Sequence, residues 1–480
     1  MSPIDALRAI HEELWDPERG MDRFARGVVP GVDISSLNLH AVRETALAAF
    51  LDLEDGIADR AVTAIRSVLA LQYPTSDWPW SGTFPVTAEQ HDPPGADAIE
   101  WVHYDPNWRQ FVGCILALIA LHHGPHLPGD VRSGIDKALA RCVHGEPDTR
   151  IAPWYTNPNL MHAWLLGRVG RATGDGSMSR AGEQRVRHIM ERFERYGDID
   201  EYNSPTYDGI DLFALALWAT HPPTPAYERS GQLVLARLGA RISTLYHRGL
   251  GAMCGPHIRA YGLDLRSYVS LVGIWLHIAG EPAPSILPAA LDQDTVHIHD
   301  LYFLPIVQQL APAVLDHLAL HELTSPRRHV QRFGDVCAES VLRADLAVGW
   351  EYGRRHDASL DQYVPFTADL MVDGEPSSVG VMVPDETAWI DVRRAGHVGQ
   401  VQDPDDLAFD MRAAGRDDRV GLRIVAGSEA TVGPDRVMLG AVAICFDVPP
   451  DAIVQDRTPI GHEIHVTWNT TEITAHITID

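Results

Sequence analysis

The sequence lacks long apolar runs. No segment approaches the roughly 20 consecutive apolar residues that a membrane-spanning helix needs. The first ten residues carry Asp5 and Arg8 where a secretory signal needs an unbroken apolar core. We therefore expect a cytoplasmic protein that is neither exported nor inserted into a membrane.

Cysteine is scarce as well. The five cysteines are odd in number, widely scattered and without the spacing of a metal site. We predict that they are buried, reduced thiols. They are Cys114, Cys142, Cys254, Cys337 and Cys445.

Positive charge is in the minority. There are 39 Lys and Arg residues against 65 Asp and Glu residues, which gives a formal net charge of −26. Nucleic acid and anionic membranes would be repelled, so we expect neither as a partner. A local pair such as Arg259 and Arg266 can still reverse the field inside a cleft, which leaves an anionic small molecule or oligosaccharide as a possible substrate. The oligomeric state leaves no trace in the sequence.

Common cofactor motifs are also missing. No dinucleotide-binding G-x-G-x-x-G, phosphate loop or G-x-S-x-G nucleophile elbow stands where a strand and a helix would support it. We therefore expect no cofactor and no metal, and look for chemistry carried by the side chains alone.

What the sequence does contain is a recurring polar and aromatic loop that precedes an apolar segment. The richest copy is 201–211, where Pro205 keeps Ser204 out of helical geometry. The other copies are 103–108, 154–159 and 255–262. Their marker residues Asn107, Asn157, Asn203 and His257 lie 50, 46 and 54 residues apart. A period of this length is typical of stacked helical hairpins, and a closed ring of hairpins would present all four loops to one cleft.

The remaining helices follow from apolar residues spaced three and four apart. The apolar inner helices are expected at 111–121, 160–169, 212–218 and 268–278. The other helices are expected at 38–51, 57–71, 131–142, 183–196, 230–246 and 305–323. The segment 73–94 is too rich in proline for a helix and is predicted to be a loop.

The pattern changes after Pro326. Short runs rich in Val, Ile and Thr alternate between turn residues, as strands with one wet face do. These runs are 340–350, 364–372, 387–392, 421–425, 437–446, 463–468 and 472–479. We predict an α/α toroid over residues 1–328 that carries the site, followed by an antiparallel β-sandwich over residues 329–480.

Five residues of the last two loops could support proton abstraction next to a carboxylate. The amide of Asn203 could stabilise charge that develops on the acid group, and the imidazole of His257 could take the proton. Tyr207 or Tyr261 could act as base or acid. Because a phenol titrates near 10 in isolation, such a base needs a cation like Arg259 beside it.

This arrangement resembles the polysaccharide lyases of the hyaluronate and chondroitin lyase type and their glucuronan- and alginate-cleaving relatives. The resemblance covers the toroid and sandwich architecture and, by residue type, two short loops. It implies β-elimination of a uronic-acid saccharide, with Asn203 as carboxylate neutraliser, His257 and Tyr261 as base and acid, and Arg259 as charge stabiliser. Two features depart from that family, since its Arg commonly lies well beyond its Tyr and its members usually carry an export signal. An oligosaccharide that has already been imported would fit the second departure.

The same loops and the proline-rich segment supply candidate substrate-binding residues. Tryptophan rings can stack on sugars, although plain packing is the favoured explanation for either tryptophan. These candidates are Trp78, Trp80, His103, Tyr104, Asn107, Tyr155, Asn157, Asp208 and Asp211.

Other interpretations remain open. Asp105, Asp208 and Asp211 could supply the two carboxylates of an inverting glycoside hydrolase, or they could cap helices. A dehydratase, an isomerase or a carbohydrate-binding protein would also suit the toroid. The segment 297–300 brings His297 and His299 to one face and could bind a metal, but the sequence offers no evident further ligand.

Overall fold

The structure is a computed structural model that describes residues 1–28, 38–355, 362–372, 374–395, 407–416 and 418–479. Contacts group the chain into two compact units, which we describe separately. Unit 1 comprises Met1–Asp200, Ile210–Arg237 and Ala290–His317. Unit 2 comprises Glu201–Gly209, Leu238–Ala289 and Leu318–Asp480. A division into domains at residue 328 stays a prediction, although the last helical turn before it ends at His317 and the first strand after it begins at Arg327.

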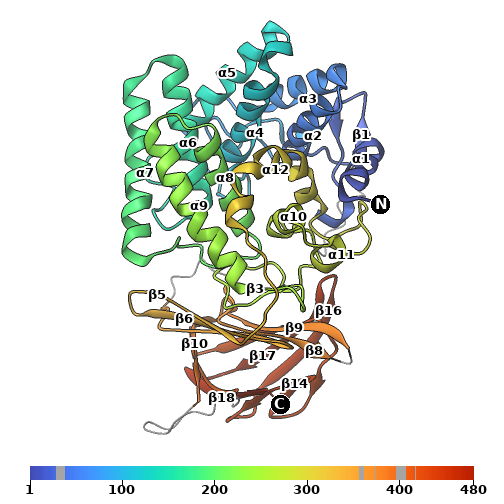
Figure 1. Cartoon of the computed structure of the whole chain (residues 1–480), viewed down its shortest axis with the longest axis vertical. Coiled ribbons are helices and arrows are strands. Elements are labelled where there is room, and N and C mark those ends of the chain that lie inside the picture. Colours follow the sequence, from blue (N-terminus) through green and yellow to red (C-terminus); the bar gives the residue numbers. More distant parts are fainter. Residues whose placement is uncertain (29–37, 356–361, 373, 396–406, 417, 480) are drawn as a thin grey trace. The chain divides into compact units, whose positions relative to one another are not determined.

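Unit 1 is built from helical hairpins (Figure 1). Each inner helix is followed by an outer partner, and in the first three hairpins the two helices pack side by side. The inner helices are α2 (Val42–Glu54), α4 (Trp108–His123), α6 (Thr156–Thr173) and α8 (Asp208–Thr220). The outer helices are α3 (Ala58–Leu71), α5 (Gly129–His144), α7 (Gly176–Tyr196) and α9 (Pro225–Leu245). The helix α1 (Pro3–Leu14) precedes them.

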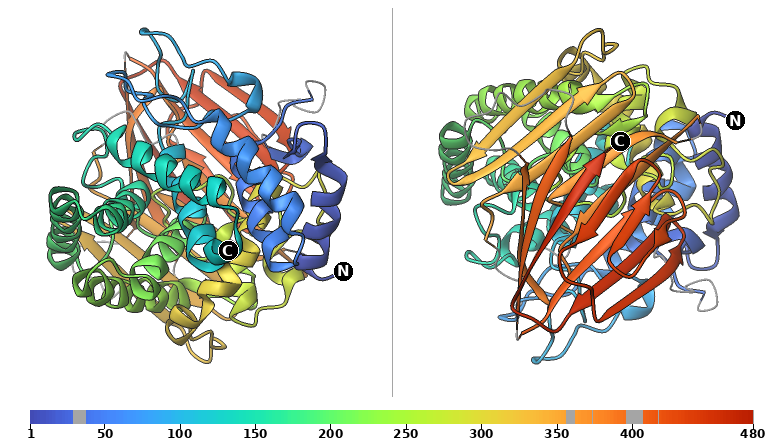
Figure 2. Two further views of the ribbon diagram at one scale, coloured as in Figure 1. Left: turned by 90° about the horizontal axis from the view of Figure 1, so that it is seen from above. Right: turned by 90° about the horizontal axis from the view of Figure 1, so that it is seen from below.

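The hairpins close into a ring. Helix α2 packs on α4, and α4 packs on α6. The indole of Trp218 in α8 donates to the Leu160 carbonyl of α6, and Phe213 of α8 meets Phe303 at a ring distance of 5.6 Å. Phe303 ends the 3-10 helix η5 (Ile298–Phe303), which together with α12 (Leu304–Leu310) packs back on α2. The helices follow one another around this ring in chain order (Figure 2, left). The predicted toroid is confirmed.

One helix prediction is wrong. The segment 305–323 does not form a continuous helix, because α12 ends at Leu310 and gives way to two 3-10 turns, Ala311–Ala313 and Leu315–His317. Pro312 has no N–H to donate, so the helical ladder cannot continue through it.

Among the described residues, unit 2 contains two large antiparallel sheets. The larger has the order β16-β17-β12-β9-β8-β7-β6-β5, and the smaller has the order β10-β11-β18-β15-β14-β13. Phe409 of β11 contacts Trp350 of β7 and Phe366 of β8, so the sheets pack face to face (Figure 2, right). The predicted β-sandwich is confirmed. The larger sheet contains β5 (Arg327–Phe333), β6 (Val336–Arg343), β7 (Leu346–Tyr352), β8 (Phe366–Val372), β9 (Glu375–Met382), β12 (Val420–Ala426), β16 (Ala452–Thr458) and β17 (Gly461–Trp468). The smaller contains β10 (Thr387–Arg394), β11 (Ala408–Gly415), β13 (Thr431–Val432), β14 (Arg436–Leu439), β15 (Val442–Phe446) and β18 (Glu472–Ile479).

Several strands differ from their predicted bounds. The run 340–350 is a hairpin of β6 and β7, and 437–446 is a hairpin of β14 and β15. Five strands of these two sheets were not predicted: the two-residue strand β13 and the longer strands β5, β9, β11 and β16. Their sequences are rich in charged or small residues, and they form because neighbouring strands supply the partners, not because of intrinsic propensity.

Unit 2 also contains the segment 238–289, with the hairpin β3 (Tyr246–His247) and β4 (Ala252–Met253) and the helices α10 (Leu271–Ile278) and α11 (Ala283–Ile286). The loop 255–262 lies on the larger sheet. His257 exchanges both main-chain hydrogen bonds with Val364, and Ser340 of β6 donates to the Gly255 carbonyl at 2.6 Å. A Cβ at Gly349 would stand 1.8 Å from the same carbonyl oxygen, so the close approach needs a glycine there. The sheet thereby fixes the position of the loop.

Two bulk predictions can be compared with the structure. All five cysteines are free; four are buried and Cys445 is partly exposed. Within the residues that the structure describes, no helix has both the length and the apolar character of a membrane span.

Candidate functional site

The four recurring loops meet in two pairs. The loops around Asn107 and Asn157 belong to unit 1, and those around Asn203 and His257 belong to unit 2. In unit 2 the Ile258 N–H donates to the Tyr202 carbonyl, and the Ser204 hydroxyl donates to the Arg259 carbonyl at 2.6 Å. A single cleft lined by all four loops stays a prediction.

The second pair of loops builds a compact group of side chains, which we call the Tyr–Arg cluster: Glu201, Tyr207, Arg259, Tyr261 and Gln362. The two phenol oxygens of Tyr207 and Tyr261 lie 2.7 Å apart. Arg259 donates from Nη2 to the Tyr207 hydroxyl at 2.9 Å, and its Cζ lies 3.8 Å from the centroid of the same ring. Its other nitrogens reach Glu201 Oε1 at 2.8 Å and Gln362 Oε1 at 3.2 Å. The guanidinium is thus held on three sides.

Short polar residues set this geometry. The Ser204 hydroxyl accepts from the Tyr207 N–H at 2.9 Å while it donates to the loop of Arg259. The Thr206 hydroxyl accepts from the Tyr261 N–H at 3.0 Å. Pro205, between them, disfavours helical geometry at Ser204, and the turn 205–207 leads into α8, which begins only at Asp208. Each tyrosine is therefore fixed through its own main chain.

Exposure increases across the cluster. The side chain of Glu201 is 3% exposed and that of Arg259 is 16% exposed, whereas Tyr261 is 38% exposed. The cluster therefore runs from a buried carboxylate, through a cation and an inner phenol, to an outer phenol that a substrate can reach. Such a chain can move a proton and stabilise a phenolate, because hydrogen bonds and a cation favour the charged form.

Asn203 is placed differently from what its predicted role requires. It is fully buried and has φ +54°, a left-handed conformation that asparagine tolerates better than most residues. Its Nδ2 donates to the carbonyls of Cys254 at 2.7 Å and Pro256 at 2.9 Å, so both amide hydrogens are used. Its Oδ1 has no hydrogen-bond partner among the described residues. The amide clamps the loop 255–262 and has no hydrogen left to donate to a carboxylate.

His257 is also enclosed. It is 1% exposed, and its Nδ1 lies 2.7 Å from the Asn203 carbonyl oxygen, so Nδ1 carries the proton. Burial lowers the pKa of His257 to about 4, against the smaller opposing effect of the carbonyls of Asn203 and Met253. The imidazole is neutral and joins the two loops.

The aspartates at the start of α8 are buried. Asp208 pairs with Arg241 at 2.7 Å and accepts from the Ser204 N–H at 3.2 Å. Asp211 is fully buried. Asp208 therefore anchors the loop 201–209 to Arg241 within unit 2.

The first pair of loops forms a network in unit 1. Asn107 donates from Nδ2 to the Tyr155 hydroxyl at 2.7 Å, and Arg150 donates to Asn107 Oδ1 at 2.9 Å. Arg150 also pairs with Glu146 at 2.6 Å. Asn157 is buried, whereas His103 is exposed and its Nδ1 accepts from the Ile99 N–H.

The tryptophans of the proline-rich loop have separate positions. Trp80 is 6% exposed and packs with Tyr73 and Tyr104 in a small core, and its indole donates to the Gly95 carbonyl. Its ring and that of Tyr104 are therefore covered by protein. Trp78 is 46% exposed, so its ring remains accessible to a ligand.

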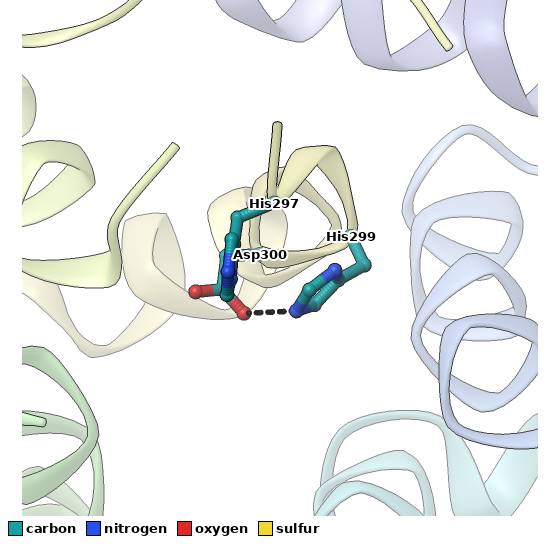
Figure 3. Close-up of side chains that lie close together, drawn as sticks. All are labelled: His297, His299 and Asp300. Atoms are coloured by element: carbon teal, nitrogen blue, oxygen red, sulfur yellow. Dashed lines mark ion pairs between the residues drawn. The ribbon is translucent and has the colours of Figure 1, made fainter. Parts of the chain in front are cut away.

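Unit 1 also holds carboxyl groups with raised pKa values. Burial raises the pKa of Asp105 to about 6, although Asn107 N–H and nearby cations act in the opposite direction. Burial likewise raises the pKa of Asp300 to about 7. Asp300 lies beside His297 and His299 (Figure 3), and these three residues together could hold a metal ion.

Sequence reasoning missed some members of these networks. Glu201 belongs to the loop 201–211, but nothing in the polar sequence of that loop indicates that its carboxylate pairs with Arg259. Gln362 lies 103 residues from Arg259, and Arg150 precedes its loop. No local pattern marks the last two, because only the folded chain brings them to their partners.

Comparisons with known proteins identify a sequence family and several solved structures with a similar fold. A family model described as "Domain of unknown function (DUF8769)" matches residues 32–312. No curated protein matches the sequence.

Several solved structures are similar to the chain. A chondroitin AC lyase of Streptomyces coelicolor A3, in complex with chondroitin sulphate, is 11% identical with a TM-score of 0.42, over 99% of this chain and 78% of that chain. The endoglucanase CelQ of Clostridium thermocellum is 11% identical with a TM-score of 0.31, over 92% of this chain and 83% of that chain. A GH127 β-arabinofuranosidase is 9% identical with a TM-score of 0.34, over 100% of this chain and 76% of that chain.

Proposed function

The chain belongs to the family of the domain of unknown function DUF8769, and we propose that it is a carbon–oxygen lyase that cleaves a uronic-acid-containing saccharide by β-elimination. The observation that carries the proposal is the Tyr–Arg cluster, in which an exposed phenol is hydrogen-bonded to a second phenol that a guanidinium contacts directly.

The chemistry required is specific. In a uronic acid the C5 hydrogen stands next to the carboxylate, and the glycosidic oxygen leaves from C4. A base must remove a weakly acidic proton, the charge that develops on the carboxylate must be stabilised, and the leaving oxygen needs a proton. Tyr261, being the outer phenol, is the group we assign to both proton transfers.

The reaction then balances with one side chain. The ionised oxygen of Tyr261 takes the C5 proton, the C4–O bond breaks as the C4–C5 double bond forms, and the same phenol returns the proton to the departing oxygen. In this step the hydrogen bond between Tyr207 and Tyr261 spreads the charge of the ionised phenol over two oxygens. Arg259 stabilises that charge through its bond to Tyr207 and its position over the ring.

The partners of Arg259 hold it for this role. Glu201 and Gln362 fix two of its nitrogens, which leaves the Nη2 that reaches Tyr207 in a defined direction. A preorganised cation contributes more than a mobile one, because no reorganisation is needed as the charge moves.

Asn203 and His257 enter the proposal as positioning residues. Both hydrogens of the Asn203 amide hold the loop that carries Arg259 and Tyr261, and the neutral His257 ring ties that loop to the Asn203 main chain. Because both amide hydrogens of Asn203 are used in this way, the substrate carboxylate must be bound by other side chains. A cytoplasmic enzyme that acts on imported oligosaccharides is part of the same proposal.

The test is direct. The purified protein is incubated with a panel of uronate oligosaccharides while the absorbance of a new conjugated double bond is followed. We expect absorbance to rise with at least one uronate substrate and to stay flat with the matching neutral sugars. If neutral saccharides are cleaved and no uronate is, the lyase proposal fails.

A glycoside hydrolase is the second candidate, and one observation favours it. Asp105 has a pKa raised to about 6 by burial, which suits a general acid at neutral pH. The carboxylate of Asp208, by contrast, is engaged by Arg241 within unit 2. Under this alternative, Asp105→Asn would abolish cleavage, Tyr261→Phe would be tolerated, and the products would carry no double bond.

A further inference from the structure

We propose that His297, His299 and Asp300 form a binding site for a divalent transition-metal ion in unit 1. The proposal is independent of the lyase reaction, because none of these residues belongs to the Tyr–Arg cluster. From the sequence, the two histidines lacked an evident third ligand, and the fold supplies it in the next residue along the chain.

The three side chains converge. One ligand atom from each residue can be chosen so that all three lie within 4.8 Å of one another. In Figure 3 the side chains of His297 and Asp300 overlap in projection, and the ring of His299 reaches toward the Asp300 carboxylate. The turn that leads from His297 into the 3-10 helix contributes to this, because side chains three residues apart, such as those of His297 and Asp300, eclipse one another in that geometry.

The contact between His299 and Asp300 has the spacing of two metal ligands. His299 Nε2 lies 3.4 Å from Asp300 Oδ1, which is long for a hydrogen bond involving a carboxylate. Two ligand atoms bound at about 2.0–2.1 Å in a tetrahedral arrangement are about 3.4 Å apart. The pair is therefore better spaced for sharing an ion than for bonding to each other.

The ring of His299 has a second unusual atom. Its Nδ1 is buried and has no hydrogen-bond partner among the described residues. A neutral imidazole always carries one N–H and one lone pair, and leaving such groups unsatisfied costs about 1–3 kcal/mol. An ion bound to Nε2 would use the lone pair of that nitrogen and fix the tautomer with the proton on Nδ1.

The main chain holds the ligands in place. His297 has φ +56°, an uncommon conformation for a residue that is not glycine. Its N–H donates to the Gly27 carbonyl at 2.8 Å, and its own carbonyl accepts from the Asp300 N–H at 3.0 Å. Backbone strain of this kind persists where the surroundings enforce it, often at ligand sites.

The local charge permits a cation. Arg43 and Glu44 both act electrostatically on Asp300, and they pair with each other at 2.7 Å. Glu44 Oε2 is a further buried oxygen with no partner among the described residues. Arg43 also acts on both imidazoles, and its ion pair with Glu44 offsets this positive charge around the site.

The donor set selects the type of ion. Two imidazoles and one carboxylate suit Zn²⁺, Co²⁺ or Ni²⁺ better than Mg²⁺ or Ca²⁺, which prefer oxygen ligands. Three protein ligands leave a position for water or a substrate group, as in sites where the ion takes part in chemistry.

The experiment uses the full chain after dialysis against a chelator. Titration calorimetry with Zn²⁺ measures affinity and stoichiometry, and the visible absorption of bound Co²⁺ reports the ligand field. We expect one ion per wild-type chain. The variants His299→Ala and Asp300→Asn should bind about 100-fold more weakly or worse, since even outer-shell partners are worth about 10–100-fold.

The matched control is His126→Ala, which removes an exposed imidazole of the same unit outside the site. It should bind like the wild type. Asp300→Asn changes few atoms, so circular dichroism on that variant separates loss of metal from loss of fold. The proposal is overturned if the wild type binds Zn²⁺ no more tightly than folded Asp300→Asn, or if His126→Ala loses as much affinity as the site variants.

Discussion

The two loop pairs use similar residues and arrange them differently. In unit 1, Arg150 reaches Tyr155 through the amide of Asn107 and is paired with Glu146. In unit 2, a second arginine donates directly to a phenol, and that phenol bonds to another that is exposed. The first arrangement holds two loops together, whereas the second couples a cation to a group that a substrate can touch. Similar residue types therefore serve different purposes in the two units, depending on whether the arginine contacts a tyrosine directly and whether an exposed tyrosine follows.

Removing the outer phenol should have the largest effect. We expect Tyr261→Phe to lower kcat by about 10²–10⁴, because it removes the group assigned to both proton transfers. The matched change in unit 1, Tyr155→Phe, removes a hydroxyl from a structural network and should leave kcat within about a factor of ten. Steady-state kinetics on one active uronate substrate measures both. Equal losses in the two variants would erase the distinction between the loop pairs.

Changing the cation should come next. Arg259→Lys keeps a charge but cannot hold Glu201, Gln362 and Tyr207 at once, so we expect a fall in kcat of about 10²–10³ with folding retained. Arg150→Lys should instead lower the melting temperature with kcat nearly unchanged. If Arg259→Lys affects only the melting temperature, its contact with Tyr207 is structural as well.

Replacing the clamp amide should act mainly on stability. Asn203→Ala removes the donor for two carbonyls and places alanine at φ +54°, so we expect a loss of about 1–3 kcal/mol in the free energy of unfolding. Asn203→Gly loses the same bonds without the penalty for positive φ and should be the more stable of the two. Denaturant unfolding measures both variants. A fully stable Asn203→Ala with no turnover would return Asn203 to a direct role in catalysis.

The smallest effect concerns pH. The pKa of His257 is near 4 in the folded chain and about 6.5 when unfolded, so the unfolded state binds the extra proton first as pH falls. Stability from this group is complete above pH 6.5 and is lost on going down to pH 4, by on the order of 3 kcal/mol.

The variant His257→Gln carries no titrating group at this position. Its free energy of unfolding should therefore fall less steeply than that of the wild type between pH 6.5 and pH 4. Parallel slopes for the two proteins would mean that burial does not depress this pKa.

The sequence predicts the architecture well because periodicity is a local property. The inner helices from α4 to α8 and strands such as β17 and β18 are recognisable from their own residues. The edge strand β5 and the break after α12 are not, since they depend on a neighbour and on one proline.

The site was predictable only in part. The pattern of loops brought Tyr207, Arg259 and Tyr261 into one hypothesis, and these residues do lie together. The pattern did not indicate that Asn203 would donate both amide hydrogens to main-chain carbonyls. The two acceptors lie 51 and 53 residues further along the chain, and only the folded structure brings them to Asn203. The same holds for the third ligand of His297 and His299, which became evident only from the turn at Ile298.

The central claim is that the Tyr–Arg cluster breaks a carbon–oxygen bond by elimination, and the masses of the products test it most directly. A uronate oligosaccharide of known mass is digested with the wild-type protein and with Tyr261→Phe, and the masses of both fragments are measured by mass spectrometry. Elimination predicts that the two fragment masses sum to that of the substrate, and that Tyr261→Phe forms the fragments far more slowly. Fragments that together weigh one water molecule more than the substrate would mean hydrolysis and would contradict the account.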